Sequence, residues 1–155
     1  MNYIAKIVLL IFLIFTSSCG YKPILSAQDS NFAITNIKFV GDKSIVSKIR
    51  NNFEIYKDRE NKSKFYDLEI YLNKEKKIIT KDSKGNPKIL EILVTSNIVV
   101  LENNEIKNKK TISKSFSYNN SSDKFSLKRY EKNIENNLIE EIVSSIILDL
   151  YSMQW

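Results

Sequence analysis

Hydrophobic and polar residues alternate along three stretches of the chain, and a fourth stretch is long and rich in β-branched residues; together they predict four β-strands. The expected strands cover residues 33–40, 65–72, 89–101 and 106–118. Three of these strands place a set of side chains on one face: Ala33, Thr35, Ile37 and Phe39 in the first, Tyr66, Leu68, Ile70 and Leu72 in the second, and Ile112, Phe116 and Tyr118 in the last. A sheet built from these strands therefore has one face suited to packing.

Two other stretches have the 3.6-residue period of an amphipathic helix. The first follows Gly41, begins with Asp42 as its N-cap and runs to about Tyr56. Its apolar stripe consists of Ile45, Val46, Ile49 and Phe53. The second begins near Lys124, and its stripe consists of Tyr130, Ile134, Leu138, Ile142, Ile146 and Leu150, with Ile139, Val143 and Ile147 beside them. Each stripe needs an apolar surface to cover.

The order strand, helix, three strands, helix predicts an α+β fold. We expect a two-layer sandwich, in which both helices pack on one face of a four-stranded, mostly antiparallel sheet. Turn residues Gly85-Asn86-Pro87 separate the second strand from the third, and Asn103-Asn104 marks a short turn before the fourth.

The first eighteen residues have the parts of a secretory signal peptide. Lys6 supplies the positive charge, Ile7 to Phe15 form an apolar block, and Thr16-Ser17-Ser18 are small and polar. As a helix, the block rises only about 14 Å, against about 30 Å for the hydrocarbon core of a bilayer. A membrane anchor is the alternative interpretation of this segment.

Cys19 is the single cysteine of the chain and directly follows this segment. A signal peptide directs a chain to an oxidising compartment, where a cysteine without a partner would be a free or intermolecular thiol. The alternative that we favour is lipidation of Cys19 as the new N-terminus, since small residues precede it and Gly20 follows. The predicted organisation is a signal peptide over residues 1–18, a lipidated tether over 19–32 and a single α+β domain over 33–155.

Composition argues against several classes of function. The formal net charge is +6 and histidine is absent, which excludes Ser-His and Cys-His nucleophiles and zinc sites that contain histidine. Three glycines, at 20, 41 and 85, form no phosphate-binding loop. Asp67 and Glu69 share one strand face, where paired carboxylates could act as acid and base, but a solvated sheet face explains them better. We therefore expect no enzyme, no cofactor, no metal and no nucleic-acid partner.

The start of the predicted mature chain, Cys19-Gly20-Tyr21-Lys22-Pro23-Ile24-Leu25, resembles that of the lipopolysaccharide-assembly lipoproteins, the LptE family. The order of elements, Ser117-Tyr118-Asn119 before the last helix, and Ile49-Arg50-Asn51 within the first helix are similar too. Thr16, three positions before the cysteine, and a last helix rich in Lys, Asn and Glu depart from the family pattern. The resemblance covers nearly all of the predicted mature chain.

This resemblance implies a lipid-anchored protein on the periplasmic side of the outer membrane. Its implied partner is the β-barrel that inserts lipopolysaccharide into the outer leaflet, which the lipoprotein plugs and helps to assemble; lipopolysaccharide is a second implied contact. A generic periplasmic lipoprotein that binds a small ligand or peptidoglycan is the alternative.

A lysine-rich stretch from Lys74 to Lys88 is the candidate binding element. We expect Lys76, Lys77, Lys81 and Lys84 to lie around the tip of a hairpin, where ammonium groups suit the phosphates of lipopolysaccharide or acidic loops of a barrel. The simpler interpretation is a solvated loop in a lysine-rich chain. Lys107, Lys109 and Lys110 should lie at the opposite end of the sheet.

Overall fold

A computed structural model describes residues 30–153 of the chain. It contains four strands, two α-helices and one short 3-10 helix. In chain order the elements are β1 (Phe32–Gly41), α2 (Lys43–Phe53), the 3-10 helix η1 (Glu54–Tyr56), β2 (Lys64–Lys81), β3 (Pro87–Glu102), β4 (Glu105–Asn119) and α3 (Lys124–Ser152). The predicted order of elements is confirmed.

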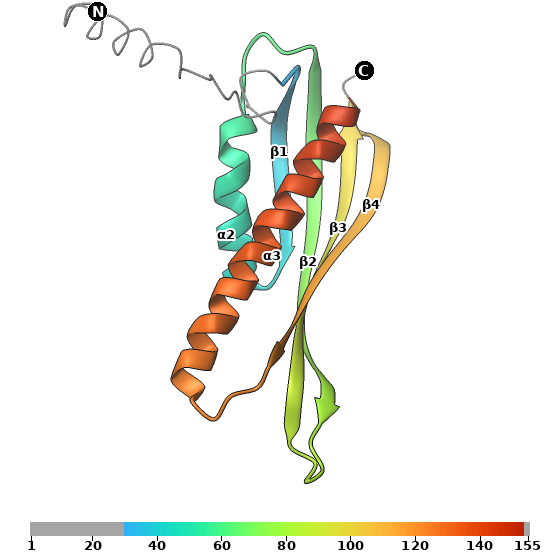
Figure 1. Cartoon of the computed structure of the whole chain (residues 1–155). Coiled ribbons are helices and arrows are strands. Elements are labelled where there is room, and N and C mark those ends of the chain that lie inside the picture. Colours follow the sequence, from blue (N-terminus) through green and yellow to red (C-terminus); the bar gives the residue numbers. More distant parts are fainter. Residues whose placement is uncertain (1–29, 154–155) are drawn as a thin grey trace, which may run out of the picture.

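The four strands form one sheet in the order β1-β2-β3-β4. β1 pairs with β2 in parallel, because the chain crosses over through α2, and the other two pairs are antiparallel. Both helices lie on the same side of the sheet, with α3 crossing it obliquely and α2 beside β1 (Figure 1). The predicted mostly antiparallel sheet with two helices on one face is therefore confirmed.

The core lies between the helices and the face of the sheet that they cover, which we call the inner face. The predicted inner residues of β2 are all buried: Tyr66, Leu68, Ile70 and Leu72. The stripe of α2 is buried at Ile45, Ile49 and Phe53, and Val46 packs against it in part. The stripe of α3 is buried from Ile134 to Leu150. Tyr130 differs from the prediction, since it is exposed and its ring meets that of Tyr118 edge-on at 6.1 Å.

β1 does not keep the predicted alternation along its whole length. Its pairing with β2 shifts register between Ile34 and Asn36. A bulge at this point places one extra residue, Thr35, in the strand and changes which side chains face inward. Before the shift, Ile34 lies opposite the buried Tyr66, whereas Ala33, predicted to point inward, lies opposite the exposed Phe65 and so on the other face, although it is also buried. Thr35, predicted to point inward, is exposed. Ile37 and Phe39 pack against the core as predicted.

Both helices begin at an aspartate that caps them. The carboxylate of Asp42 accepts a hydrogen bond from the N–H of Ser44 at 2.8 Å, and that of Asp123 accepts from Phe125 and Ser126. Gly41 makes the tight exit from β1, since its φ is +137° and a Cβ there would lie 2.0 Å from the carbonyl oxygen of Leu72. α2 ends at Phe53, three residues before the predicted end, and η1 replaces its last turn.

The β2–β3 hairpin is longer than the pattern predicts. Residues 74–81, which we expected to be a polar connection, continue β2 as a regular strand. The turn comprises residues 82–86, so Gly85 and Asn86 lie in it, whereas Pro87 is the first residue of β3. The other predicted turn is confirmed: Asn103 and Asn104 join β3 to β4 and both have positive φ, as type I′ hairpin turns require.

Candidate functional site

The hairpin tip, residues 81–88, is a structured turn at one end of the molecule. Asp82 organises it, because its carboxylate accepts hydrogen bonds from the N–H of Lys84 at 2.9 Å and of Asn86 at 2.8 Å. The side-chain amide of Asn86 also donates to this carboxylate at 3.1 Å. These bonds, led by those from Asn86, hold the pKa of Asp82 below its ordinary value. The turn therefore presents Lys84 on an ordered backbone.

The four lysines predicted to bind phosphate do not share one surface. Lys76 points to the inner face, where its ammonium contacts the carboxylate of Glu131 at 2.6 Å. Lys77, the next residue along the strand, points to the opposite face and contacts Glu75 at 3.0 Å. The ammonium groups of Lys81 and Lys84 form no ion pair within residues 30–153. Only these two of the four are therefore available at the tip.

Carboxylates of α3 engage many lysines of the inner face. Glu135 lies between two of them, at 2.7 Å from Lys48 of α2 and 2.8 Å from Lys74 of β2. Further pairs link α3 to β4: Glu141 with Lys114 at 3.5 Å, and Asp149 with Lys110. These contacts tie α2, β2 and β4 to α3, and the sequence contained no signal that would assign the partners.

Lysines that contact Glu135 and Glu131 favour the ionised form of both carboxylates. Burial tends to raise the pKa of Glu135, but the hydrogen bonds from Lys48 and Lys74 outweigh burial, so the pKa lies below its ordinary value. Glu131 behaves in the same way, with Lys76 and the Tyr118 hydroxyl as donors. The net effect on Tyr118 is the reverse, because burial and the nearby Glu131 carboxylate raise its pKa.

Apolar side chains are exposed at the same end as the hairpin tip. Phe125, in the first turn of α3, is 78% exposed, and Ile78 of β2 is 50% exposed. The guanidinium of Arg129 lies 5.9 Å from the centre of the Phe125 ring. Figure 1 shows the start of α3 and the hairpin at one end of the molecule. The hydrophobic pattern did not single out these residues as a candidate site. A signal was present, since Phe125 is an apolar residue outside the α3 stripe and Ile78 is an apolar residue within the lysine-rich stretch.

The outer face of the sheet, which points away from both helices, has no covering layer within residues 30–153 (Figure 1). Asp67 and Glu69 lie on it, as predicted, and each is engaged by β1. Asp67 accepts a hydrogen bond from the side-chain amide of Asn36 at 2.9 Å, and Glu69 contacts the ammonium of Lys38 at 3.2 Å. The two carboxylates therefore have separate partners on β1.

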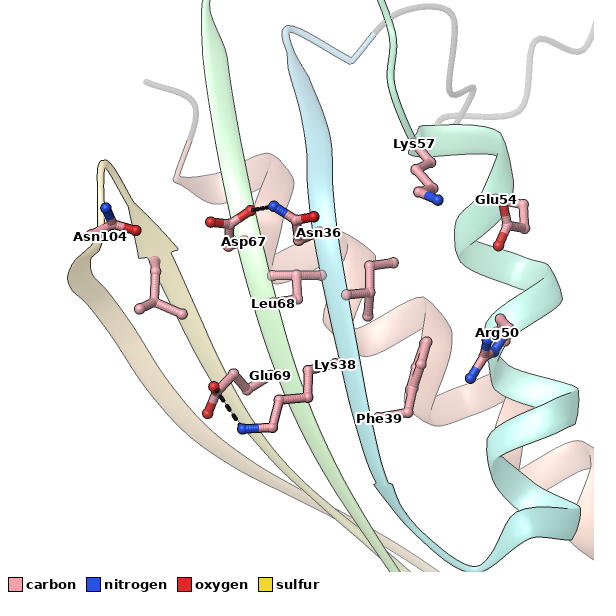
Figure 2. Close-up of a pocket in the computed structure, with 12 residues that line it drawn as sticks. Asn36, Lys38, Phe39, Arg50, Glu54, Lys57, Asp67, Leu68, Glu69 and Asn104 are labelled. Atoms are coloured by element: carbon pink, nitrogen blue, oxygen red, sulfur yellow. Dashed lines mark hydrogen bonds and ion pairs between the residues drawn. The ribbon is translucent and has the colours of Figure 1, made fainter.

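A cavity of about 450 Å³ lies along β1 and opens toward α2 (Figure 2). Arg50, Glu54 and Lys57 line it from the helical side, and Phe39 lines it from the strand. The guanidinium of Arg50 lies over the Phe39 ring, 5.4 Å from its centre. This cavity had no counterpart in the sequence analysis, because it depends on the distance between a strand edge and a helix.

Several predictions concern parts of the chain or ligands that this geometry does not address. Cys19 and the signal peptide over residues 1–18 lie outside the described residues, as does the tether up to residue 29. Within residues 30–153, no three Cys, Asp or Glu side chains are grouped as a metal site would require. No helix in that part of the chain has the length and apolar character needed to span a bilayer.

Comparison with known proteins gives matches in structure only. No protein-family model matches the chain, and no curated protein matches it in sequence. The rare lipoprotein B of Shewanella oneidensis has a TM-score of 0.60 at 11% identity, over 77% of this chain and 96% of that one. A minor lipoprotein of Acinetobacter baumannii has a TM-score of 0.59 at 10% identity, over 77% of this chain and 90% of that one.

A third similar structure is lipoprotein B of Nitrosomonas europaea, with a TM-score of 0.58 at 14% identity, over 83% of this chain and 88% of that one. At these identities the likeness concerns the fold. This chain therefore has the same α+β fold as these bacterial lipoproteins, along most of their length.

Proposed function

We propose that this chain is an outer-membrane lipoprotein, acylated at Cys19, that plugs and helps to assemble a β-barrel lipopolysaccharide translocon. The fold is the observation that carries the proposal, because solved structures named as lipoproteins share it over most of their chains. The signal-peptide pattern before Cys19 supports the lipid anchor independently of the fold. The resemblance of residues 19–25 to the LptE family supports the choice of barrel.

The shape of the molecule suits a plug. β2 has 18 residues, which extend about 60 Å at about 3.3 Å per residue, roughly twice the hydrocarbon core of a bilayer. The uncovered outer face offers a broad polar surface to a lumen wall. Its centre carries small hydroxyl and amide side chains that bond across the strands, such as Thr95 with Ser113 and Thr111 with Asn97.

The hairpin tip is the proposed contact for lipopolysaccharide. Lys81 and Lys84 supply ammonium groups without an ion pair in the described part of the chain, while Lys76 and Lys77 already contact carboxylates. Exposed Ile78 and Phe125 at the same end provide apolar surface for acyl chains. We therefore assign the main phosphate contacts to Lys81 and Lys84, with Lys76 and Lys77 in a lesser role.

An affinity pull-down tests the function. The full chain, tagged at its C-terminus, is captured from detergent-solubilised outer membranes, and co-purifying proteins are identified by mass. The proposal predicts one dominant partner, an integral β-barrel, in a fixed ratio to the lipoprotein. A Cys19→Ser variant should leave the outer-membrane fraction. Capture of the wild-type chain alone from that fraction would contradict the proposal that it plugs a barrel. It would favour a periplasmic lipoprotein that binds a small ligand or peptidoglycan.

A further inference from the structure

The two edges of the sheet differ in how they are protected. An exposed edge strand offers unpaired N–H and C=O groups, and proteins commonly block such edges with lysines. β4 follows this rule, with four lysines along it: Lys107, Lys109, Lys110 and Lys114. Three of them form ion pairs, and Lys109 forms none within residues 30–153. β1 carries only Lys38, and its ammonium is drawn over the outer face to Glu69. The β1 edge therefore lacks the usual block.

The beginning of the β1 edge already pairs with a short extended segment of the same chain, Lys57-Asp58. The carbonyl oxygen of Ile34 takes a hydrogen bond from the N–H of Asp58 at 3.1 Å, and Ile34 forms a parallel bridge with Lys57. From Asn36 to Val40, β1 pairs with β2 on one side, and no described strand pairs with it on the other. About five residues of edge are therefore open beyond the segment that the chain itself covers.

The open edge lies beside α2, and a cavity of about 450 Å³ runs along it (Figure 2). Its lining reaches from Arg50 and Lys57 on the helical side to Asp67, Glu69 and Asn104 on the other side of β1. This arrangement, an unpaired strand next to a helix, is the geometry in which a domain binds an extended peptide by adding a strand to its sheet. An added strand would lie about 4.8 Å from β1, with alternate side chains pointing toward α2.

The cavity is lined by three cations, Lys38, Arg50 and Lys57, and by three carboxylates, Glu54, Asp67 and Glu69. Asp67 and Glu69 already have partners on the outer face, in Asn36 and Lys38. Arg50 has no hydrogen bond or ion pair in the described part of the chain, and its guanidinium is placed over the Phe39 ring. Lys57 is the second cation on the helical side and contacts Asp58 at 3.9 Å, whereas Glu54 is the single carboxylate among the lining residues of that side. On the helical side, two cations therefore face one carboxylate. A guanidinium with unused donors recognises a carboxylate with two parallel hydrogen bonds.

We propose that β1, from Asn36 to Val40, binds an extended segment of a partner protein as a fifth strand, with an acidic side chain of that segment on Arg50. Backbone hydrogen bonds to β1 supply most of the affinity, and Arg50 sets the preference for an acidic residue. Apolar neighbours of this residue on the same face of the segment pack against Ile37 and Phe39, which lie only partly within the core. The inference does not depend on the proposed function, since it concerns a surface away from the hairpin tip.

A peptide titration followed by NMR tests the proposal. The probe is a capped peptide, Thr-Val-Thr-Glu-Thr-Val-Thr, added to the isotope-labelled full chain in detergent. Two matched peptides carry Gln at the centre or N-methyl groups on the backbone. We expect the Glu peptide to shift the amide signals of residues 36–40, the Gln peptide to bind about tenfold more weakly, and the N-methylated peptide not to bind.

The Arg50→Gln variant separates recognition from folding. It should lower the affinity for the Glu peptide to that for the Gln peptide while leaving the other amide signals in place. Equal affinity of the wild-type chain for the Glu and Gln peptides would overturn the role of Arg50. Binding of the N-methylated peptide, or shifts outside β1 and α2, would overturn strand addition. A dimer found by sedimentation, with β1 amides protected from hydrogen exchange, would also overturn the proposal, since a second copy would then occupy the edge.

Discussion

Lysines facing the body of α3 differ from lysines at the hairpin tip in whether a carboxylate pairs with them. Along the body of the helix, Glu135 and Asp149 hold lysines of the sheet and of α2 in ion pairs that fix the layers together. At the end of the molecule where α3 begins and the hairpin tip lies, Lys81 and Lys84 have no such partners in residues 30–153. The comparison shows that a lysine-rich sequence contains both paired and available cations, and that α3 supplies the partners of the inner-face lysines Lys74, Lys76 and Lys110.

The largest effect is expected in the core under α3. Leu138→Ala removes a side chain that is 3% exposed and should lower the free energy of unfolding by about 2–5 kcal/mol. Leu148→Ala is the matched control, because Leu148 lies on the same helix at 54% exposure and should cost less than about 1 kcal/mol. Chemical denaturation measures both. Equal losses would mean that α3 does not pack on the sheet through its predicted stripe.

The next largest effect concerns the ion pairs. Glu135→Gln removes the charge between Lys48 and Lys74, both within 2.8 Å of its carboxylate, and should cost about 1.5–3 kcal/mol because hydrogen bonds to a charged group are lost. Glu140→Gln changes the same charge at an exposed neighbour on α3 and should cost less than about 0.5 kcal/mol. If the two variants melt alike, the carboxylates of α3 do not hold the layers together.

The pH dependence sharpens this comparison. The pKa of Glu135 is lower in the folded state than its ordinary value of 4.5, so its ion pairs stabilise the fold fully above that value. This stabilisation is lost as the pH falls through the folded pKa, because the unfolded chain then binds the proton more readily. The stability difference between wild type and Glu135→Gln should therefore shrink below about pH 4.5. A difference that stays constant down to pH 3 would assign the cost to packing instead.

Features of the fold that depend on residues close together in the sequence could be predicted, and features that depend on pairing between distant strands could not. The stripe of α2 was predictable because Ile45, Ile49 and Phe53 recur at helical spacing and Asp42 caps the helix. The bulge at Thr35 was not, since nothing in an alternating segment marks where the register shifts. The end of β2 was not predicted for another reason. The charges of Lys76 and Lys77 indicated a loop, although Ile78, Ile79 and Thr80 have high strand propensity.

The candidate sites depend on tertiary contacts that a linear pattern does not contain. The sequence placed Lys76 and Lys84 in one basic group, but the partner of Lys76 is Glu131, more than fifty positions away. The open edge of β1 and its cavity with Arg50 depend on the strand order and on the position of α2, which spacing along the chain does not determine. The separation of Lys107 from the hairpin tip was predictable, since a short turn fixes an antiparallel pair.

The smallest effect on stability is expected at the hairpin tip. Lys81→Gln with Lys84→Gln should change the free energy of unfolding by less than about 0.5 kcal/mol, because neither ammonium has an ion pair within the described residues. Binding to lipopolysaccharide should weaken, and most strongly at low salt. The control is Lys43→Gln with Lys109→Gln, which removes the same charge away from the tip. Equal loss of binding in both double variants would mean that the tip acts only through the net charge of the protein and is not a specific contact.

Photo-crosslinking from the outer face of the sheet tests the plug most directly. A photoreactive residue replaces Asn97, which lies exposed near the middle of that face, and the full lipidated chain is irradiated in intact outer membranes. We expect one dominant adduct with an integral β-barrel protein, identified by mass. An outer face that yields no protein adduct, in membranes where the lipoprotein is present, would contradict the proposal that a barrel encloses it.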